Sequence, residues 1–314
     1  MTDQSSRIAF ALPGNETLAA SLASSLDAEQ GTLTVRHFPD GETYVRIESL
    51  VRGRDVVLAC TFDRPDDKIL PLLFIASTAR DLGARRVGLI APYLAYMRQD
   101  RRFKEGEGVT STHFARLLSA SIDWLVTADP HLHRRHSLSE IYTIPAEVVP
   151  AAPRVASWIR EHVERPLLVG PDGESEPLIR AVALAASAPA VVLEKVRRGD
   201  RDVSVSVPDI DLWREHTPVL VDDIISTAHT MIETVRHLAG AGIRPPVCIG
   251  VHAVFAAGAY AELSASGPAR IVTCDTIPHP SNAIALGPDL CAAAGRLLGI
   301  AEDSSCGGRA AVVR

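Results

Sequence analysis

The sequence of 314 residues has no long block of Lys and Arg that could follow a nucleic-acid backbone. Acidic residues outnumber basic ones, 38 to 32, so the formal net charge at pH 7 is −6. A chain of this charge repels a polyanion. We therefore expect no nucleic-acid partner.

The apolar runs that mark secreted and membrane proteins are also missing. The N-terminal stretch MTDQSSRIAFALPGNETLAA contains one Arg, no apolar core of secretory length and a Pro13-Gly14 pair in its middle. We therefore expect neither a signal peptide nor a membrane span, and a cytoplasmic location.

Cysteine is scarce, with five residues scattered over the chain and mostly set in apolar surroundings. An odd number at irregular spacing fits neither a disulfide framework nor a zinc site. We expect reduced, buried thiols without a chemical role.

The sequence does have the composition of a folded protein, with 46% hydrophobic and 22% charged residues, and its length suits two compact units. Short apolar runs alternate with amphipathic stretches, which predicts strand-helix-strand units and a parallel sheet. This alternation restarts after the Pro/Ala-rich segment VVPAAPRVASWI. We therefore predict an α/β fold with domains at 1–150 and 151–314.

The segment PVLVDDIISTAHTMIETVRHL is the most informative for chemistry. An apolar strand delivers Asp222 and Asp223 to its carboxyl end, and a turn with the hydroxyls of Ser226, Thr227 and Thr230 opens a helix. Such a turn suits phosphate, since backbone amides and the helix N-terminus favour an anion. The two carboxylates suit sugar hydroxyls or a metal ion. A surface turn with a Ser/Thr helix cap is the alternative.

This segment resembles the phosphoribosyl-diphosphate loop shared by type I phosphoribosyltransferases and ribose-phosphate diphosphokinases. FPDGETYVRI at 38–47 and APYLAYMRQDRRF at 91–103 are similar to the two ATP-site segments of the diphosphokinases alone. The resemblance covers nearly the whole chain. It implies two phosphoribosyltransferase-like domains, each a mostly parallel sheet flanked by helices, with ATP bound by the first and ribose 5-phosphate by the second.

The resemblance also implies site residues. The 38–47 segment would cross between subunits to hold adenine, which implies a homodimer or homohexamer with a shared ATP site. Ribose 5-phosphate would be bound by Asp222 and Asp223 and by the turn Ser226, Thr227, Ala228, His229 and Thr230. The implied ATP-site residues are Phe38, Asp40, Glu42, Arg98, Gln99, Asp100 and His131.

Asp129-Pro130-His131 follows a predicted strand and resembles the Asp-Leu-His segment of the family. The implied cofactor is Mg²⁺, held near His131 and near Asp172 of a Pro-Asp-Gly turn, where one imidazole among oxygen ligands is plausible. Zinc is an alternative suggested by three further histidines. Because no Cys or carboxylate of zinc spacing accompanies them, we expect surface histidines. They are His113, His133 and His136.

Lys195 and Arg197 lie two residues apart in the charged segment VVLEKVRRGDRDVSVSV. In the diphosphokinases a mobile Lys-x-Arg loop of this form closes on the ATP phosphates, so the resemblance implies that both residues are catalytic. Phosphoryl-type transfer depends mainly on alignment and on cations that stabilise negative charge. An exposed basic hairpin tip is the alternative.

The sequence departs from the family at three places. His229 stands where the phosphate loop usually has Gly, so a bulky ring faces the expected 5-phosphate. The segment after His131 lacks the Gln-containing, Phe-rich continuation. The acids of 104–108 replace a Ser/Arg-rich stretch and would repel regulatory anions, so we expect weak or absent activation by phosphate.

These observations predict a ribose-phosphate diphosphokinase of nucleotide biosynthesis, which transfers the β,γ-diphosphate of Mg-ATP to the C1 hydroxyl of ribose 5-phosphate. Two alternatives stay open. One is an inactive regulatory homologue of the same family, which His229 allows, and the other is a type I phosphoribosyltransferase.

Overall fold

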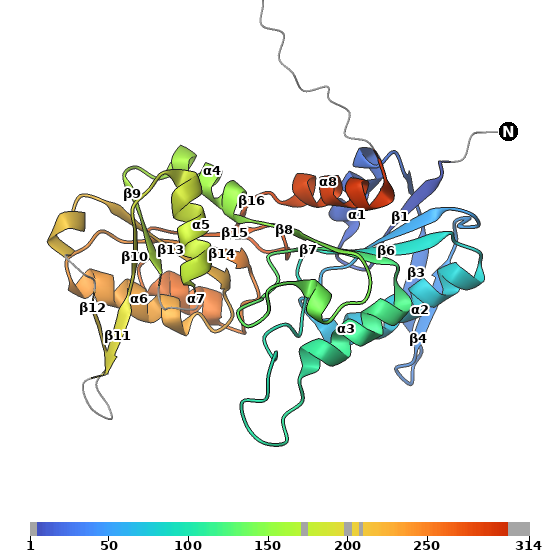
Figure 1. The fold of residues 1–314 in the computed structure, drawn as a ribbon, viewed down its shortest axis with the longest axis horizontal. Helices are drawn as coiled ribbons and strands as arrows, with labels where there is room; N and C mark the ends of the chain where they lie inside the picture. Colours follow the sequence, from blue (N-terminus) through green and yellow to red (C-terminus); the bar gives the residue numbers. More distant parts are fainter. Residues whose placement is uncertain (1–4, 171–174, 198–202, 207–209, 301–314) are drawn as a thin grey trace, which may run out of the picture.

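The computed structural model describes residues 5–170, 175–197, 203–206 and 210–300. Two six-stranded sheets lie end to end, one in each half of the chain (Figure 1). All the strand pairs within both sheets are parallel. The α/β class with mostly parallel sheets is therefore confirmed.

The N-terminal sheet is buried on both faces. Alternate residues of a strand point to opposite faces, and in the central strand Val57 and Ala59 join one core while Val56 and Leu58 join the other. Helices α1 (Glu16–Ser25) and α8 (Gly287–Leu298) cover the first face, and α2 (Pro65–Asp81) and α3 (Thr110–Ser121) cover the second. The strand order is β2 (Glu29–Gln30), β1 (Arg7–Ala11), β5 (Asp55–Ala59), β6 (Arg86–Ala91), β7 (Trp124–Ala128), β8 (Ala146–Val149).

The C-terminal sheet has the same construction. Helices α4 (Ala152–His162) and α5 (Glu176–Ala186) pack on one face, and α6 (His229–Gly240) and α7 (Ala259–Ala265) pack on the other. Its strand order is β10 (Ala190–Val192), β9 (Pro166–Gly170), β13 (Thr217–Ile224), β14 (Val247–His252), β15 (Arg270–Cys274), β16 (Asn282–Ile284).

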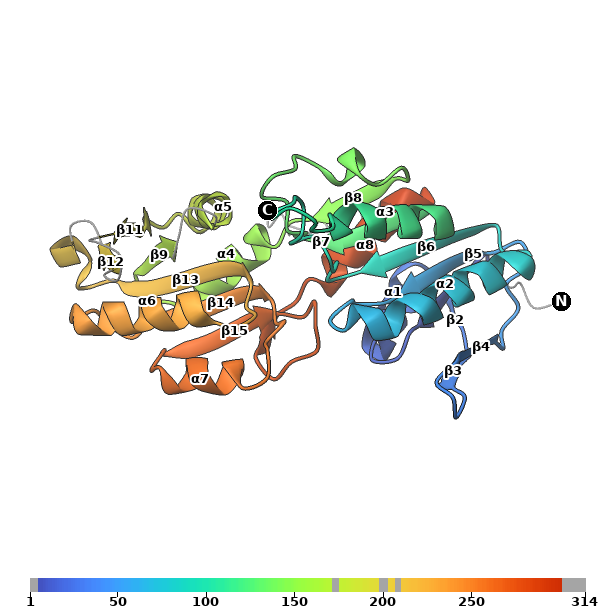
Figure 2. The same ribbon diagram turned by 90° about the horizontal axis from the view of Figure 1, so that it is seen from below.

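Two antiparallel hairpins extend from this body. The first pairs β3 (Leu33–His37) with β4 (Thr43–Ile47) and projects from the N-terminal half (Figure 2). The second pairs β11 (Glu194–Arg197) with β12 (Val203–Ser206) in the C-terminal half. Short 3-10 helices occur at Leu138–Glu140 and Ile210–Trp213.

The last helix does not stay with its own half. From the C-terminal half, α8 returns to pack on α1 and on the strands β7 and β8 (Figure 1). Arg154 of α4 pairs with Asp289 of α8 at 2.6 Å, and Arg296 of α8 pairs with Glu147 of β8. One apolar core therefore runs through both halves, and the predicted division into 1–150 and 151–314 stays a prediction.

Two expectations about composition can be compared with the fold. The four cysteines of the described part of the chain are free and buried, as expected. Burial raises the pKa of the Cys60 and Cys248 thiols to about 12, which keeps them protonated and unreactive. A search of the described helices finds none whose length and apolar character would let it cross a bilayer.

Candidate active site

A polar cavity forms where the ends of strands from both halves meet. Its wall includes the carboxyl end of β13 and the turn that leads into α6, in agreement with the general position of ligand sites in open α/β sheets. The N-terminal half contributes the segments after β6 and β7. The lining residues with polar side chains are Arg98, His131, His133, Ser175, Asp222, Asp223, Ser226, Thr227, His229 and Thr230.

The turn from β13 to α6 is suited to bind an anion. Ala228 adopts a left-handed conformation with φ of 58° and precedes the first residue of α6. Its side chain cannot cap the helix, so the first N–H groups of α6 face the cavity without a side-chain acceptor from the cap position. The hydroxyls of Ser226, Thr227 and Thr230 line the same hollow. These groups together form a phosphate-sized cradle of donors.

His229 does not occupy a position that requires glycine. The left-handed residue of the turn is Ala228, whereas His229 begins α6 in helical conformation. The residue is also exposed, although it lines the cavity. Histidine is therefore compatible with the backbone of the turn, and its place in the cavity lining leaves the expected encounter with the 5-phosphate a prediction.

Close packing holds this turn against the next strand. Ile225 is buried directly over Gly250 of β14, and a Cβ atom added to that glycine would lie 2.6 Å from the Ile225 side chain. The N–H of Ile225 also donates to the carbonyl oxygen of His252 at 3.1 Å. Only glycine lets the turn sit this close to the sheet.

The side chain of Asp223 meets the N-terminal half directly. Its Oδ2 lies 2.6 Å from Nδ1 of His131, which follows β7, and 3.6 Å from Nε2 of His133. Burial alone would raise the pKa of Asp223, but the hydrogen bonds of His131 and His133 outweigh it and hold this pKa well below its ordinary value. Asp223 is therefore a carboxylate at neutral pH.

His133 is exposed, as expected for a surface histidine. Its ring also lies edge-on against His131 with a centroid distance of 3.9 Å and lines the cavity, which was not predicted. The signal available in the sequence was the His-x-His spacing directly after a strand. In extended chain, residues two apart point to the same side, so both imidazoles can reach one ligand.

A second buried group supports the segment that carries His131. His252 of β14 is fully buried, and its Nε2 lies 3.1 Å from the carbonyl oxygen of Asp129. The Asp129 carboxylate accepts the N–H of Ala151 at the start of α4. Burial raises the pKa of Asp129 to about 6, an effect that the Ala151 N–H opposes and the charge of Asp223 reinforces. Backbone and side chain of Asp129 are thus both held by residues of the C-terminal half.

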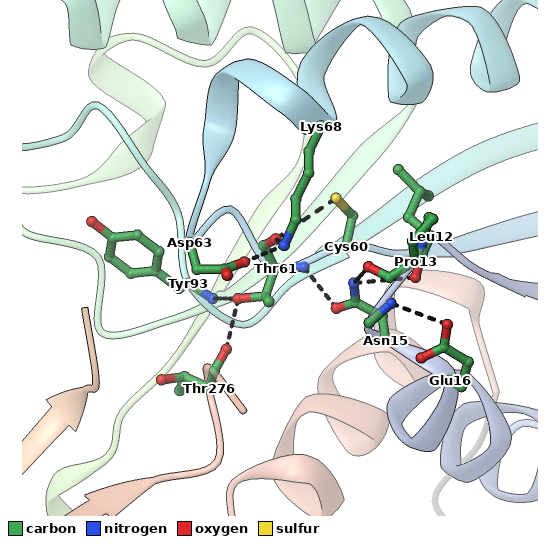
Figure 3. Close-up of polar contacts among 11 residues, drawn as sticks. Leu12, Pro13, Asn15, Glu16, Cys60, Thr61, Asp63, Lys68, Tyr93 and Thr276 are labelled. Atoms are coloured by element: carbon green, nitrogen blue, oxygen red, sulfur yellow. Dashed lines mark hydrogen bonds and ion pairs between the residues drawn. The ribbon is translucent and has the colours of Figure 1, made fainter. Parts of the chain in front are cut away.

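The polar network continues from His252 through Thr276 into the N-terminal half (Figure 3). The Thr61 hydroxyl donates to the carbonyl oxygen of Thr276 at 2.6 Å, and the Thr61 N–H donates to the side-chain oxygen of Asn15 at 2.8 Å. Lys68 donates to the Thr61 carbonyl at 2.9 Å and pairs with Asp63. Thr61 and Thr276 are 215 residues apart in the sequence and buried. This contact ties the two halves together.

The three predicted residues of the second ATP segment have different surroundings. Arg98 lines the cavity. The side-chain oxygen of Gln99 accepts from the Thr110 hydroxyl at 3.2 Å, and the Asp100 carboxylate, 2% exposed, pairs with Arg134 at 3.3 Å. Arg135 adds bonds to the Asp100 carbonyl oxygen at 3.4 Å and to the start of α3. The segment that departs from the family after His131 thus anchors the loop that carries Arg98.

The three residues predicted to hold adenine do not line this cavity within one chain. Phe38, Asp40 and Glu42 belong to the β3–β4 hairpin, where Phe38 is 40% exposed and the N–H of Glu42 donates to Asp40. The backbones of Lys195 and Arg197 lie in β11, opposite Val205 and Val203 of β12. Asp172 lies outside the described residues.

Comparisons with known proteins agree over nearly the whole chain. The family model for the N-terminal domain of ribose phosphate pyrophosphokinase matches residues 8–121, and the model for the phosphoribosyl transferase domain matches residues 137–289. A ribose-phosphate pyrophosphokinase of Methanopyrus kandleri is 36% identical over 90% of this chain and 96% of its own. One of Saccharolobus solfataricus is 34% identical over 76% of this chain and 82% of its own.

The architecture has a solved counterpart. The crystal structure of phosphoribosylpyrophosphate synthetase from Mycobacterium smegmatis superposes with a TM-score of 0.83 and 23% identity, covering 94% of this chain and all of that one. The predicted pair of phosphoribosyltransferase-type domains is thereby confirmed. From the two family models and relatives that match almost end to end, the chain belongs to the ribose-phosphate pyrophosphokinase family.

Proposed function

We infer that this enzyme is a ribose-phosphate diphosphokinase, which moves the β,γ-diphosphate of ATP to the C1 hydroxyl of ribose 5-phosphate. The observation that carries the assignment is the contact between His131 and Asp223 in one cavity. It brings a strand end of the N-terminal half against the strand end of β13, which lies in the segment matched to the phosphoribosyl transferase domain. The named relatives are enzymes of this type.

We assign the sugar phosphate to the C-terminal wall of the cavity. The turn of 226–230 offers hydroxyls and helix N–H groups to the 5-phosphate, and the exposed His229 leaves its backbone available. Asp222 and Asp223 have carboxylates at the strand end that suit the ribose hydroxyls, since each carboxylate accepts two or more hydrogen bonds.

ATP would enter from the N-terminal wall. Arg98 has the planar donors that match phosphate oxygens, and His131 lines the same cavity. Gln99 and Asp100, given their contacts with α3 and Arg134, would act by holding this loop. The nucleotide and the sugar phosphate would then bind in the same cavity.

The residues present fit a divalent cation. The Asp223 carboxylate and the His131 imidazole face the same space, and a buried carboxylate kept ionised favours a cation. We propose that His131, with Asp172 from outside the described residues, holds Mg²⁺ bound to the nucleotide phosphates. A bound Mg²⁺ would neutralise the charge of the diphosphate being transferred.

The reaction is an in-line displacement. The C1 oxygen attacks the β-phosphorus, the bond from that phosphorus to the oxygen bridging the α-phosphate breaks, and AMP leaves with the bonding electrons. The proton of the C1 hydroxyl passes to solvent. Little covalent chemistry falls to the protein, so the cavity acts by alignment and charge. Lys195 and Arg197 of the second hairpin are the cations that we assign to the transferred group.

The first hairpin supports a shared site in an oligomer. Phe38 lies partly exposed, with the Arg36 guanidinium 4.7 Å from its ring and 4.1 Å from that of Tyr44. An aromatic and cationic surface of this kind can stack on a purine. Since the hairpin projects from the N-terminal half (Figure 2) and does not line the cavity of its own chain, we propose that it completes the ATP site of a neighbouring subunit in a homodimer or homohexamer. A cytoplasmic location remains our expectation for an enzyme with these substrates.

One assay tests the proposal. The purified chain is incubated with ATP, Mg²⁺ and ribose 5-phosphate, and AMP and phosphoribosyl diphosphate are quantified. The expected result is equimolar formation of both, dependent on the sugar phosphate. Absence of AMP would indicate an inactive homologue, and base-dependent release of diphosphate from phosphoribosyl diphosphate without ATP would indicate a phosphoribosyltransferase.

A further inference from the structure

Three side chains that can bind a metal ion gather at the junction of the two halves. They are His131 and His133 after β7, and Asp223 at the end of β13. One ligand atom from each lies within 4.8 Å of the others. Of these three residues, the family resemblance implied only His131 as a metal ligand, and it placed Asp223 on the sugar.

The chemistry of these donors differs from that of a magnesium site. Mg²⁺ is bound mostly by oxygen and keeps several waters, whereas imidazole nitrogen favours Zn²⁺ and neighbouring transition metals. Two imidazoles and one carboxylate form the three-ligand set of many zinc enzymes, in which water or substrate fills the remaining position. The second imidazole, His133, therefore changes which ions bind best.

The spacing of the ligand atoms is close to what such an ion requires. Ligands about 2.0 to 2.2 Å from a tetrahedral zinc ion lie about 3.3 to 3.5 Å from one another. Oδ2 of Asp223 lies 3.6 Å from Nε2 of His133, and 2.6 Å from Nδ1 of His131. An ion that entered would open the second distance by less than about 1 Å, a shift within reach of a side-chain rotation.

The surroundings also permit an open coordination position. All three residues line the polar cavity rather than a closed core, so water or a substrate oxygen can approach the ion. Asp222 lies in the same wall and adds negative charge, while Arg98 is the cation of the lining. The open coordination position of the ion would thus face the side of the cavity on which we place the phosphates.

We propose that His131, His133 and Asp223 form a binding site for a transition-metal dication of the Zn²⁺ and Co²⁺ class, which is occupied without nucleotide. The site does not depend on the proposed reaction, because its ligands all come from the folded chain. An imidazole presents a bare nitrogen to the ion by carrying its proton on the other ring nitrogen.

The test uses Co²⁺ as the probe, because a Co²⁺ ion with nitrogen ligands in four- or five-coordination has visible absorption that hydrated Co²⁺ nearly lacks. The full chain, freed of metal and nucleotide, is titrated with Co²⁺ and then with Zn²⁺. We expect one equivalent of Co²⁺ to produce the bands, Zn²⁺ to abolish them, and a large excess of Mg²⁺ to leave them unchanged. Bands that Mg²⁺ removes would overturn the proposed selectivity, and absence of bands would overturn the site.

Variants locate the ion. His133→Gln should weaken Co²⁺ binding by at least about tenfold, and Asp223→Asn should do the same. His136→Gln is the matched control, because this exposed histidine of the same loop is not part of the cluster. Equal loss in His133→Gln and His136→Gln, or no loss in His133→Gln, would overturn the assignment. Circular dichroism of each variant checks that the fold is intact.

Failure of this proposal is distinguishable from failure of the proposed function. Formation of AMP with Mg²⁺ by a chain that shows no Co²⁺ bands would leave the diphosphokinase assignment standing. Co²⁺ bands in a chain that forms no AMP would leave the metal site standing.

Discussion

The imidazole of His252 donates a hydrogen bond from Nε2 to the carbonyl oxygen of Asp129, 3.1 Å away and 123 residues earlier in the chain. A carbonyl only accepts, so Nε2 carries the proton. The Thr276 hydroxyl lies 2.9 Å from Nδ1 and 2.9 Å from the Val251 carbonyl oxygen, so its one proton is shared between these two acceptors. Burial lowers the pKa of His252 to about 4, so the ring is neutral at physiological pH and fills both roles. This bond fixes the segment that leads to His131.

Opposite pH effects on stability should follow from His252 and Asp129. The pKa of His252 is about 4 in the folded chain against 6.5 ordinarily, so the unfolded chain binds this proton more tightly and stability falls as the pH drops from 6.5 to 4. The pKa of Asp129 is about 6 against 3.8, so its contribution to stability rises as the pH drops through the same region. The two effects nearly cancel.

Single substitutions should expose each effect. In Asp129→Asn, the free energy of unfolding should fall more steeply on acidification from pH 6.5 to pH 4 than in the unaltered chain, by on the order of 2 kcal/mol. In His252→Gln, the slope should change by a similar amount in the other direction. Urea denaturation at several pH values measures both. Slopes that shift in the same direction would contradict the assigned pKa values.

Lys195 offers a test of the second hairpin. Lys195→Ala should lower kcat by about 100-fold or more. Removing one preorganised group that stabilises the charge of the transition state commonly has an effect of this size. The melting temperature should change little. Lys68→Ala is a useful contrast, since this lysine bonds to Asp63 and the Thr61 carbonyl and should mainly affect stability. Near-normal turnover of Lys195→Ala would remove it from the mechanism.

Arg135 should act on the nucleotide through the loop that it holds. Arg135→Met removes the bonds to the Asp100 carbonyl, Ser111 and Thr112, so the loop with Arg98 loosens. We expect the KM for ATP to rise by about tenfold, which corresponds to 1.4 kcal/mol, with little change in the KM for ribose 5-phosphate.

Arg80→Met serves as the control for Arg135. This arginine of α2 also forms an ion pair, with Asp123 at 3.0 Å, but does not line the cavity. It should leave both KM values unchanged. An equal rise of both KM values in Arg135→Met would point to general destabilisation.

Ala228 and His229 give a paired prediction for the phosphate turn. Ala228→Gly should stabilise the chain by about 1 kcal/mol, because glycine adopts the left-handed conformation without strain, whereas Ala228→Val should destabilise it and weaken ribose 5-phosphate binding. His229→Gly should change the affinity for ribose 5-phosphate by no more than about threefold, since that position is helical and exposed. Thermal unfolding and isothermal titration measure the two effects. A large gain of affinity in His229→Gly would mean that the ring obstructs the cradle.

The fold and one wall of the site could be predicted because their signals are local. The alternation of apolar and amphipathic stretches indicates a parallel sheet, and an apolar strand that ends in Asp222 and Asp223 places both carboxylates at a ligand-binding edge. The concern over His229 came from comparing residue types at one position. The backbone strain falls on its neighbour Ala228, and only coordinates distinguish the two.

Features that depend on contacts distant in sequence could not be predicted. His133 joins the site because β7 and β13 end at the same place, which the spacing of histidines along one segment does not show. The anchoring of Asp100 by Arg134 likewise joins side chains of opposite charge from two loops that each look solvated in the sequence. An amphipathic helix such as α8 fits the face of either sheet, so its apolar pattern does not indicate the domain that it covers.

The return of α8 to the first sheet has a consequence for synthesis on the ribosome. The N-terminal half is synthesised first. The apolar face of β7 and β8 that α8 covers therefore stays exposed until the residues up to 298 have been made. The segment that carries His131 directly follows β7. Nascent chains released early should therefore expose it to chaperones, and loss of α8 should disturb the nucleotide site that we propose, most of whose residues lie in the first half.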